Sequence, residues 1–318
     1  TISLCDWSSD VCSSDLLLLR LGNGVAVSLL LSAATTLFVR IIPPGVSGRA
    51  FGFYSLAGLL PFCVVPAAFD HFTGDPAQTA RGYMLMSLFL VPALALLLTK
   101  GRRMSRAAQA AEGAGRENAV NFRTMLANAA KAPVALLLGM NMLYLIMFSA
   151  VFFLAKSFFL HRPVADVGTF FTLQMLCIMA IRLLAMGLFD RVRKTGLIML
   201  AFGLSSAGCV LTATAHGPVQ AYAAALVLGA GMGLGSPVLN SLMFSISEKR
   251  FQAVNTNLMN MFVQMGNFLG PIIGAAAVVH GGETGFLAAG ATAGAMAFLL
   301  CAVFAARGMD RHPKEARA

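Results

Sequence analysis

Long runs of apolar residues, separated by short polar stretches, dominate the chain from Leu16 almost to its end. A transmembrane helix needs about 20 mostly apolar residues to cross the hydrocarbon layer of a bilayer. The pattern therefore predicts an all-α membrane protein with nine spans. They are expected at Leu16–Val39, Ala50–Phe69, Gly82–Leu98, Pro133–Leu154, Val167–Phe189, Leu197–Ala215, Gln220–Phe244, Leu258–Val279 and Phe286–Ala306.

The polar stretches divide these spans unevenly. Residues 99–132 form a polar segment rich in Ala and Arg, and we interpret them as a linker. Three helices (residues 16–98) precede this linker and six (residues 133–306) follow it, with residues 307–318 as a tail. Residues 1–15, TISLCDWSSDVCSSD, resemble neither a helix start nor a secretory signal, because acids precede the apolar run and no basic region does.

The basic residues predict on which side each polar stretch lies. If the linker is cytoplasmic, only Arg81, Lys156 and Arg162 fall on the outer side. Arg20 and Arg182 lie within helices, and the other 18 of the 23 Lys and Arg residues fall inside. Because Lys and Arg collect in cytoplasmic loops, this segregation supports nine spans, with the linker and the C-terminus cytoplasmic. We expect a multi-pass protein of the cell membrane.

Composition excludes several other classes of protein. The chain is 58% hydrophobic and 11% charged, whereas a soluble domain carries about 25% charged residues. The net charge of +10 reflects topology, so no nucleic-acid partner is expected. The six cysteines show neither a metal-ligand spacing nor a disulfide framework. No cofactor, metal site or enzyme signature is expected, since GAGMGLG follows no strand and no phosphate-binding loop is present.

Glycine motifs carry a family resemblance. The eighth predicted span contains GNFLGPIIG, which places Gly266, Gly270, Pro271 and Gly274 in the pattern G-x-x-x-G-P-x-x-G. Small residues at this spacing let two helices approach closely, and proline bends a helix. The first span contains RLGNG, with Gly22 and Gly24 after Arg20, the seventh contains GAGMGLGSP, and GLFDRVRK follows the fifth.

In this order, the motifs resemble those of the major facilitator superfamily. RLGNG resembles its fourth-helix motif, GLFDRVRK its basic turn, and GNFLGPIIG the fifth-helix motif of its efflux members. The resemblance implies two pseudo-symmetric halves of six helices joined by a cytoplasmic linker, with the fourth to twelfth helices present here. It also implies an N-terminal truncation, with residues 1–15 resembling translated sequencing-adapter sequence. Val65 replaces a motif glycine, and GLFDRVRK lacks the usual glycine between its basic residues.

Ionisable residues within predicted spans are candidates for function, because burying a charge in a membrane is costly. Arg20 is linked to proton coupling through the resemblance, although it could instead snorkel to the outer surface. For Arg182 we consider gating, pairing with an acid, snorkelling and contact with a substrate. Asp190 and Arg191 in the basic turn are candidates for gating by charge pairing, the alternative being membrane anchoring.

Uncharged polar residues predict a substrate cavity. The candidates are Asn141, Tyr144, Gln174, Asn240, Asn260, Gln264 and Asn267. Residues 257, 260, 264 and 267 share one helical face, which must point to a partner helix or to a water-filled cavity. Interleaved Met261 and Met265 would suit a cavity that accepts varied amphipathic molecules. The alternative is hydrogen bonding between helices.

The expected function is secondary active transport of a small solute by alternating access, by a monomer that acts as a proton-coupled exporter (an antiporter). Alternatives are a polytopic membrane enzyme or receptor, or an inactive transporter fragment. The sequence selects neither the solute nor the coupling ion.

Overall fold

The computed structural model describes residues 5–43, 45–69, 85, 87–112, 121–185 and 187–310, and within these it is helical without a strand. The helices are α1 (Cys5–Ile41), α2 (Ser47–Phe69), α4 (Leu90–Glu112), α5 (Phe122–Ala129), α6 (Ala132–His161), α7 (Val167–Leu184), α8 (Leu188–Arg191), α9 (Lys194–Ala213), α10 (Pro218–Ile246), α11 (Lys249–Gly281) and α12 (Gly285–Ala306). Every predicted span overlaps one of these helices. The all-α membrane architecture predicted from the sequence is therefore confirmed.

Seven helices in the described part of the chain are long and apolar enough to cross a membrane: α1 from Leu21, α6, α7, α9, α10, α11 and α12. The two other predicted spans overlap α2, whose last side chains are not described, and α4, which continues past the predicted end at Leu98 into the basic residues of the expected linker. α1 includes residues 5–15 of the predicted leader. Residues 311–318 of the predicted tail lie outside the described residues.

Helix ends differ from the predicted bounds where polar residues continue a helix beyond the apolar run. α11 begins at Lys249 instead of Leu258, because the amide-bearing stretch before Leu258 is helical. α6 continues to His161, with Lys156 exposed near that end. The predicted span Val167–Phe189 is divided into α7 and the short α8.

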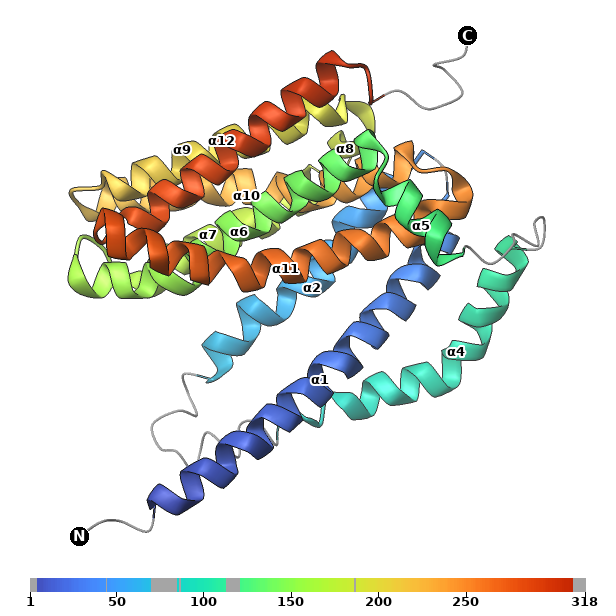
Figure 1. Ribbon diagram of the computed structural model, residues 1–318, viewed down its shortest axis with the longest axis horizontal. Coiled ribbons are helices and arrows are strands. Elements are labelled where there is room, and N and C mark those ends of the chain that lie inside the picture. Colours follow the sequence, from blue (N-terminus) through green and yellow to red (C-terminus); the bar gives the residue numbers. More distant parts are fainter. Residues whose placement is uncertain are drawn as a thin grey trace.

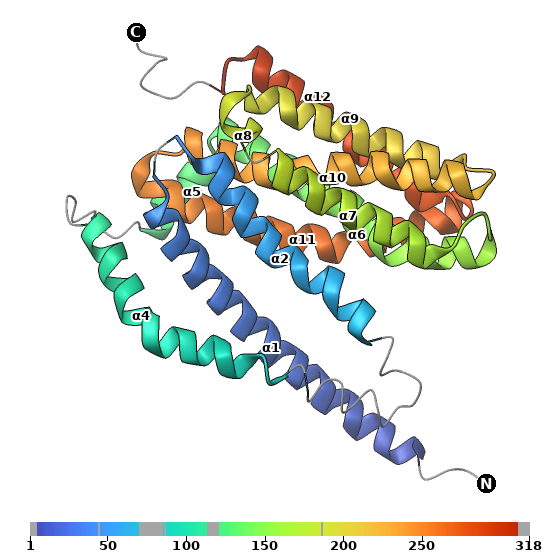
Figure 2. The same cartoon turned by 180° about the vertical axis from the view of Figure 1, so that it is seen from behind.

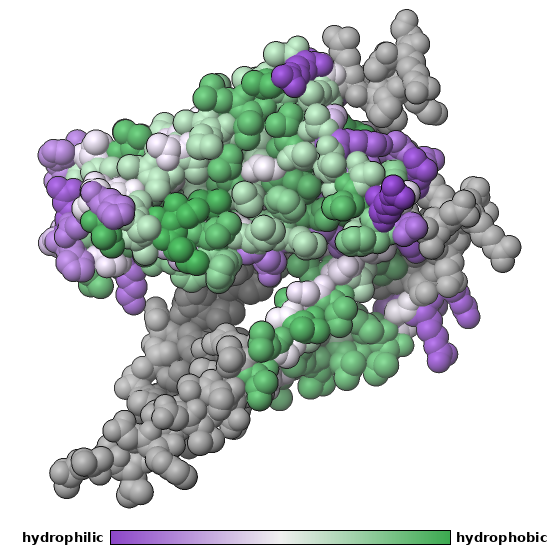
Figure 3. Space-filling view, viewed as in Figure 1, coloured by the Kyte–Doolittle hydropathy of each residue, from purple (hydrophilic) through white to green (hydrophobic). Residues whose placement is uncertain are grey.

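Helices α6, α7, α9, α10, α11 and α12 form a bundle, which we call the second half (Figure 1). α10 packs against α7 and α9, while α6 packs against α11 and α12. Phenylalanine, methionine and leucine side chains fill the core, among them Phe170, Phe202 and Phe304. On the side of the bundle seen in Figure 3 the surface is largely apolar, with hydrophilic residues towards both ends. This distribution fits a bundle whose middle is surrounded by lipid.

Glycines allow the helices of this bundle to approach closely. A Cβ atom on Gly266 would lie 2.5 Å from the Leu145 Cβ atom, and one on Gly270 would meet Ser149 and the backbone of α6. On Gly274 it would lie 2.5 Å from Leu154. The predicted packing face of GNFLGPIIG therefore lies against α6, and Pro271 is inside helix α11.

We call helices α1, α2 and α4, which begin before the expected linker, the first half. α1 packs against α4 and α11, and α2 packs against α7, α8 and α10. The views from both sides show α1 and α2 meeting the second half near α8 and the start of α11, and then diverging from it (Figures 1 and 2). The two halves are thus joined at one end of the molecule and separated towards the other.

Candidate functional site

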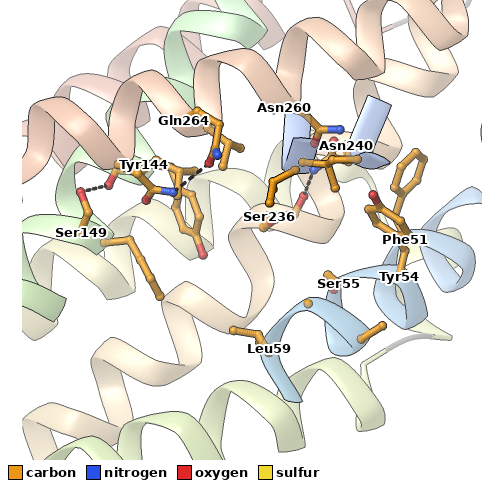
Figure 4. A pocket seen from close by; sticks show the side chains of 18 of the residues that line it. Phe51, Tyr54, Ser55, Leu59, Tyr144, Ser149, Ser236, Asn240, Asn260 and Gln264 are labelled. Carbon is orange, nitrogen blue, oxygen red and sulfur yellow. Dashed lines mark hydrogen bonds between the residues drawn. The ribbon is translucent and has the colours of Figure 1, made fainter. Parts of the chain in front are cut away.

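A large cavity lies between the two halves, where α1 and α2 diverge from α6, α7, α10 and α11 (Figure 4). Its volume is about 870 Å³. Cavities that bind small organic molecules have volumes of about 300–1,000 Å³. This central cavity is therefore large enough to enclose a small solute.

The wall of the central cavity is mostly apolar, with a limited set of polar groups. Leu30, Leu59, Phe148, Phe152 and Phe268 are among its apolar residues. Five residues that the sequence predicted for a substrate cavity also lie on this wall: Tyr144, Asn240, Asn260, Gln264 and Asn267. An apolar wall with a few fixed polar groups is typical of sites that bind amphipathic molecules.

The amide face of α11 turns towards α1 and the central cavity, which combines the two alternatives that its spacing left open. The Asn257 Nδ2 atom donates to the Thr36 Oγ1 atom, and the Asn260 Nδ2 atom to the Thr35 Oγ1 atom, each at 2.9 Å. Further along this face, the Asn267 Nδ2 atom lies 3.5 Å from the Gln264 Oε1 atom. The face therefore changes role along its length, from joining the halves to lining the cavity.

The structure corrects the cavity prediction for two residues. The buried Asn141 Nδ2 atom donates to the Met259 carbonyl oxygen at 3.0 Å, and the buried Gln174 Nε2 atom lies 3.1 Å from the Met232 sulfur. Neither residue lies on the wall of the central cavity, because both side chains are enclosed between helices of the second half. Asn141 and Gln174 therefore have the alternative role that the sequence left open, which is hydrogen bonding between helices.

The methionines of α11 also differ from the prediction. Met261 and Met265 are 58% and 44% exposed, and neither lines the central cavity. Their positions along the helix place them beside the amide face and not on it. Aromatic and aliphatic side chains supply the apolar part of the wall instead.

Arg182, in the last turn of α7, is the one charged residue among the described residues of the cavity wall. It is only 4% exposed, and its Nη1 atom donates to the Ser55 carbonyl oxygen of α2 at 3.0 Å. Its Nε atom is buried and has no hydrogen-bond partner in the described part of the chain. The guanidinium therefore faces the cavity and also connects the two halves.

Arg20, Gly22 and Gly24 lie in α1, at a distance from these contacts along the chain. The side chain of Arg20 is outside the described part of the structure. A Cβ atom on Gly22 or Gly24 would meet no described atom within 4 Å. Their predicted roles in coupling and packing stay predictions.

Asp190 connects the basic turn to the first half. Its carboxylate accepts hydrogen bonds from the backbone N–H groups of Gly48, at 2.6 Å, and Arg49, at 3.1 Å. These groups belong to the first turn of α2, where backbone N–H groups lack partners within the helix and the helix dipole favours a negative charge. Arg191 is exposed at the same turn. Asp190 thus contacts a helix terminus, and Lys194 of the same turn is near enough to interact with its charge. Gating by charge pairing stays a prediction.

Lys194 contributes a connection between the halves that the sequence did not predict. Its Nζ atom donates to the Ser47 Oγ atom and the Ser241 carbonyl oxygen, each at 3.2 Å, and also to the Ser245 Oγ atom. Ser47 and Ser241 share a further hydrogen bond of 2.9 Å. The spacing of Ser241 and Ser245, one helical turn apart on an apolar helix, is the signal that could have indicated a polar partner.

We call this set of contacts the closed end: Asp190 with Gly48 and Arg49, and Lys194 with Ser47, Ser241 and Ser245. Phe51 packs beside it against Phe244 at 6.1 Å between ring centroids. The central cavity begins beyond these contacts and continues in the direction in which α1 and α2 leave the second half (Figures 1 and 4). The cavity is therefore closed on the side of the basic turns.

Comparisons with known proteins agree with this architecture. A family model described as Major Facilitator Superfamily matches residues 152–318. The outward conformation of the transporter FucP superposes with a TM-score of 0.62 at 13% identity, over 86% of this chain and 72% of that chain. A variant of the E. coli fucose:proton symporter FucP gives 0.61 at 15% identity, over the same shares of the two chains.

A human protein matches similarly. The organic anion transporter MFSD10 superposes with a TM-score of 0.58 at 16% identity, over 85% of this chain and 67% of that chain. At these identities the neighbours show the fold alone. No curated protein matches the sequence. Because the family model covers more than half of the chain and the fold is that of the same family, the chain belongs to the major facilitator superfamily of membrane transporters.

Proposed function

We propose that this chain moves a small solute across the cell membrane by alternating access, as a monomeric secondary active transporter. The observation that carries the proposal is the central cavity of about 870 Å³, which lies between two helical halves and is closed at one end by hydrogen bonds between them. Rocking of the halves about a site at their interface would close one end as the other opens.

The basic residues give this arrangement a direction. Arg49, Lys194 and Lys249 lie at or near the closed end, and the positive-inside tendency favours the cytoplasmic side for such residues. We also propose that the linker and the C-terminus lie on the cytoplasmic side, so the cavity in this conformation would open to the exterior. FucP, which has the same fold, is described in an outward conformation.

Proton coupling is the drive that we propose. E. coli FucP is a fucose:proton symporter, and the human neighbour is an organic anion transporter, so the two neighbours agree on no solute. The described cavity wall contains no carboxylate, so the group that carries the proton would lie in another part of the protein, with Arg20 as a partner through the family resemblance. Export rests on the resemblance of GNFLGPIIG to the motif of efflux members.

Transport in proteoliposomes tests the proposal. The full chain is reconstituted, and labelled solutes are followed with and without an imposed pH gradient. We expect movement of a solute that rises several-fold with the gradient. Movement that is indifferent to the gradient would contradict proton coupling, and no movement of any solute by folded protein would contradict transport by this chain. The direction of the effective gradient distinguishes export from import.

A further inference from the structure

The central cavity contains a positive charge whose partners are incomplete. Arg182 is 4% exposed, and none of the described residues that line the cavity with it is Asp or Glu. In the described part of the chain its Nε atom has no partner, although arginine carries five N–H donors. An isolated buried charge is costly unless it is paired and hydrogen-bonded. The cavity therefore favours a ligand that brings a negative charge to Arg182.

In the described part of the chain Arg182 contacts the Ser55 carbonyl oxygen and the Tyr144 hydroxyl group, and an anion can replace neutral partners of this kind. Its Nη1 atom donates to the neutral Ser55 carbonyl oxygen at 3.0 Å. A carboxylate or sulfonate can accept from two guanidinium nitrogens at once, and such charged hydrogen bonds are about twice as strong as neutral ones. In the guanidinium group the Nη1 and Nη2 atoms form one such pair of donors, and Nε and Nη2 form the other. An anion on the Nη1–Nη2 pair would replace the Ser55 carbonyl oxygen and compensate the charge.

The rest of the wall determines the body of such a ligand. Phe148, Phe152 and Phe268 give an aromatic surface, whereas Gln264 and Asn267 offer amide groups on α11. In Figure 4, Tyr144 and Gln264 lie on one side of the cavity, and Ser55 and Leu59 of α2 on the other. A flat, largely apolar molecule would contact both sides. These groups fit an amphipathic molecule with one anionic group better than a multiply hydroxylated or a cationic one.

We propose that the solute of this transporter is an amphipathic organic anion whose carboxylate or sulfonate binds Arg182 and displaces the Ser55 carbonyl oxygen from it. The proposal rests on the transport function proposed above and names the class of solute for that cavity. Because Arg182 belongs to α7 and Ser55 to α2, the same exchange removes one connection between the halves. Binding of the solute thereby favours movement of α2 relative to the second half.

Three matched fluorescent probes test the charge preference directly. Dansylglycine is anionic, dansylglycinamide is neutral, and dansylethylenediamine is cationic, while their aromatic bodies are the same. Binding to the full chain is measured in nanodiscs of zwitterionic lipid, so that no anionic headgroup competes for Arg182, and the signal from empty nanodiscs is subtracted. We expect the anion to bind at least about tenfold more tightly than the neutral probe, because a charge-assisted pair replaces a neutral contact.

Variants of Arg182 test which residue causes the preference. Arg182→Gln keeps a donor for the Ser55 carbonyl oxygen but removes the charge, and it should bind the three probes with similar affinities. Arg182→Lys keeps the charge but not the planar fork, and it should retain part of the preference. Arg162→Gln is the matched control, because it removes one exposed positive charge outside the cavity and should leave the preference unchanged.

The wild-type measurement decides the matter even if Arg182→Gln does not fold. Equal affinities for the three probes would overturn the proposal, as expected if a carboxylate elsewhere in the protein already pairs with Arg182. A preference that survives in Arg182→Gln would overturn it as well. Binding requires no gradient and no turnover, so a chain that binds the anion but moves nothing would contradict only the transport function. A chain that transports but binds neutral probes equally well would contradict only the anionic solute.

Discussion

Gly48 leaves no room for a side chain where α2 meets α8. A Cβ atom at this position would lie 2.6 Å from the Phe189 Cβ atom and 2.8 Å from the Phe189 backbone carbon. A backbone atom cannot move aside cheaply, so Gly48→Ala should displace α2 and weaken both hydrogen bonds to Asp190. Overpacking of this kind typically costs about 1–3 kcal/mol. We expect a lower free energy of unfolding, measured by denaturant titration in detergent micelles.

Gly58→Ala is the matched control on the same helix. A Cβ atom on Gly58 would meet no described atom within 4 Å. Because alanine is favoured over glycine in a helix by up to about 1 kcal/mol, this variant should be neutral or slightly stabilised. Equal effects of the two substitutions would show that the contact at Gly48 is not as close as described.

Glu248 provides a pH-dependent contact outside the membrane spans. Its carboxylate accepts from the Lys131 Nζ atom at 3.2 Å and from the Arg250 Nε atom at 3.0 Å. The hydrogen bond from Lys131 is the main cause that holds the pKa of Glu248 below its ordinary value of 4.5. A lowered pKa stabilises the folded chain fully above the ordinary value, and this stabilisation is lost as the pH falls through the lowered one.

The pH effect is expected to be small, because both partners are largely exposed to solvent. Glu248→Gln should slightly lower the Tm near pH 7, and its difference from wild type should shrink as the pH falls below the ordinary pKa of 4.5 and through the lowered one. Thermal unfolding in detergent at several pH values measures this. In a Lys131→Gln background the effect of Glu248→Gln should be smaller. A Tm difference that grows on acidification would contradict the sign of the shift.

At the level of the helices, the sequence predicted most of the membrane-spanning segments, because a segment that crosses a bilayer must be apolar over a length set by the bilayer's thickness. The amide spacing on α11 predicted that four side chains share one face, since helical periodicity fixes which residues lie together, but it left open whether that face meets a helix or a cavity. The sequence could not show that Asn260 of α11 lies on the cavity wall, whereas Asn141 of α6 is enclosed and bonded to the Met259 carbonyl oxygen. That distinction depends on which helices become neighbours, and a single helix carries no such information.

The connection made by Lys194 shows the same limit and leads to a prediction about α2. Lys194→Met keeps the apolar stem but removes the three hydrogen bonds to Ser47, Ser241 and Ser245. The first turn of α2 should then open more often, so amide hydrogen exchange of a peptide covering residues 47–53 should rise several-fold. Exchange measured by mass spectrometry in nanodiscs checks this expectation.

Arg193→Met is the control for this measurement, because it removes the neighbouring positive charge. Arg193 donates to Asp310 at 3.0 Å, which connects α9 to the chain after α12 within the second half. We therefore expect no change in the exchange of residues 47–53. A similar rise in both variants would indicate a general effect of charge at this turn, and no rise in Lys194→Met would show that Lys194 does not hold α2.

For the whole molecule, alternating access requires the contacts of the closed end to break in each cycle, so that the central cavity can open on that side. A reversible cross-link at the closed end tests this. The Ser47 and Ser241 Oγ atoms are 2.9 Å apart, which is compatible with the Cβ separation of about 3.5–4.5 Å in a disulfide. We expect Ser47→Cys combined with Ser241→Cys, in a chain whose six cysteines are replaced by alanine, to form a disulfide on oxidation.

With that disulfide formed, alternating access predicts that transport stops while the cavity stays open to ligand from the other side. Solute flux in proteoliposomes should fall to background on oxidation and recover on reduction, whereas probe binding should change little. Ser47→Cys alone and Ser241→Cys alone are the matched controls, because neither can form this disulfide, so oxidation should leave their flux largely intact. Undiminished flux through fully oxidised Ser47–Ser241 protein would mean that the halves need not part at this end, and that the solute crosses by a route other than the central cavity.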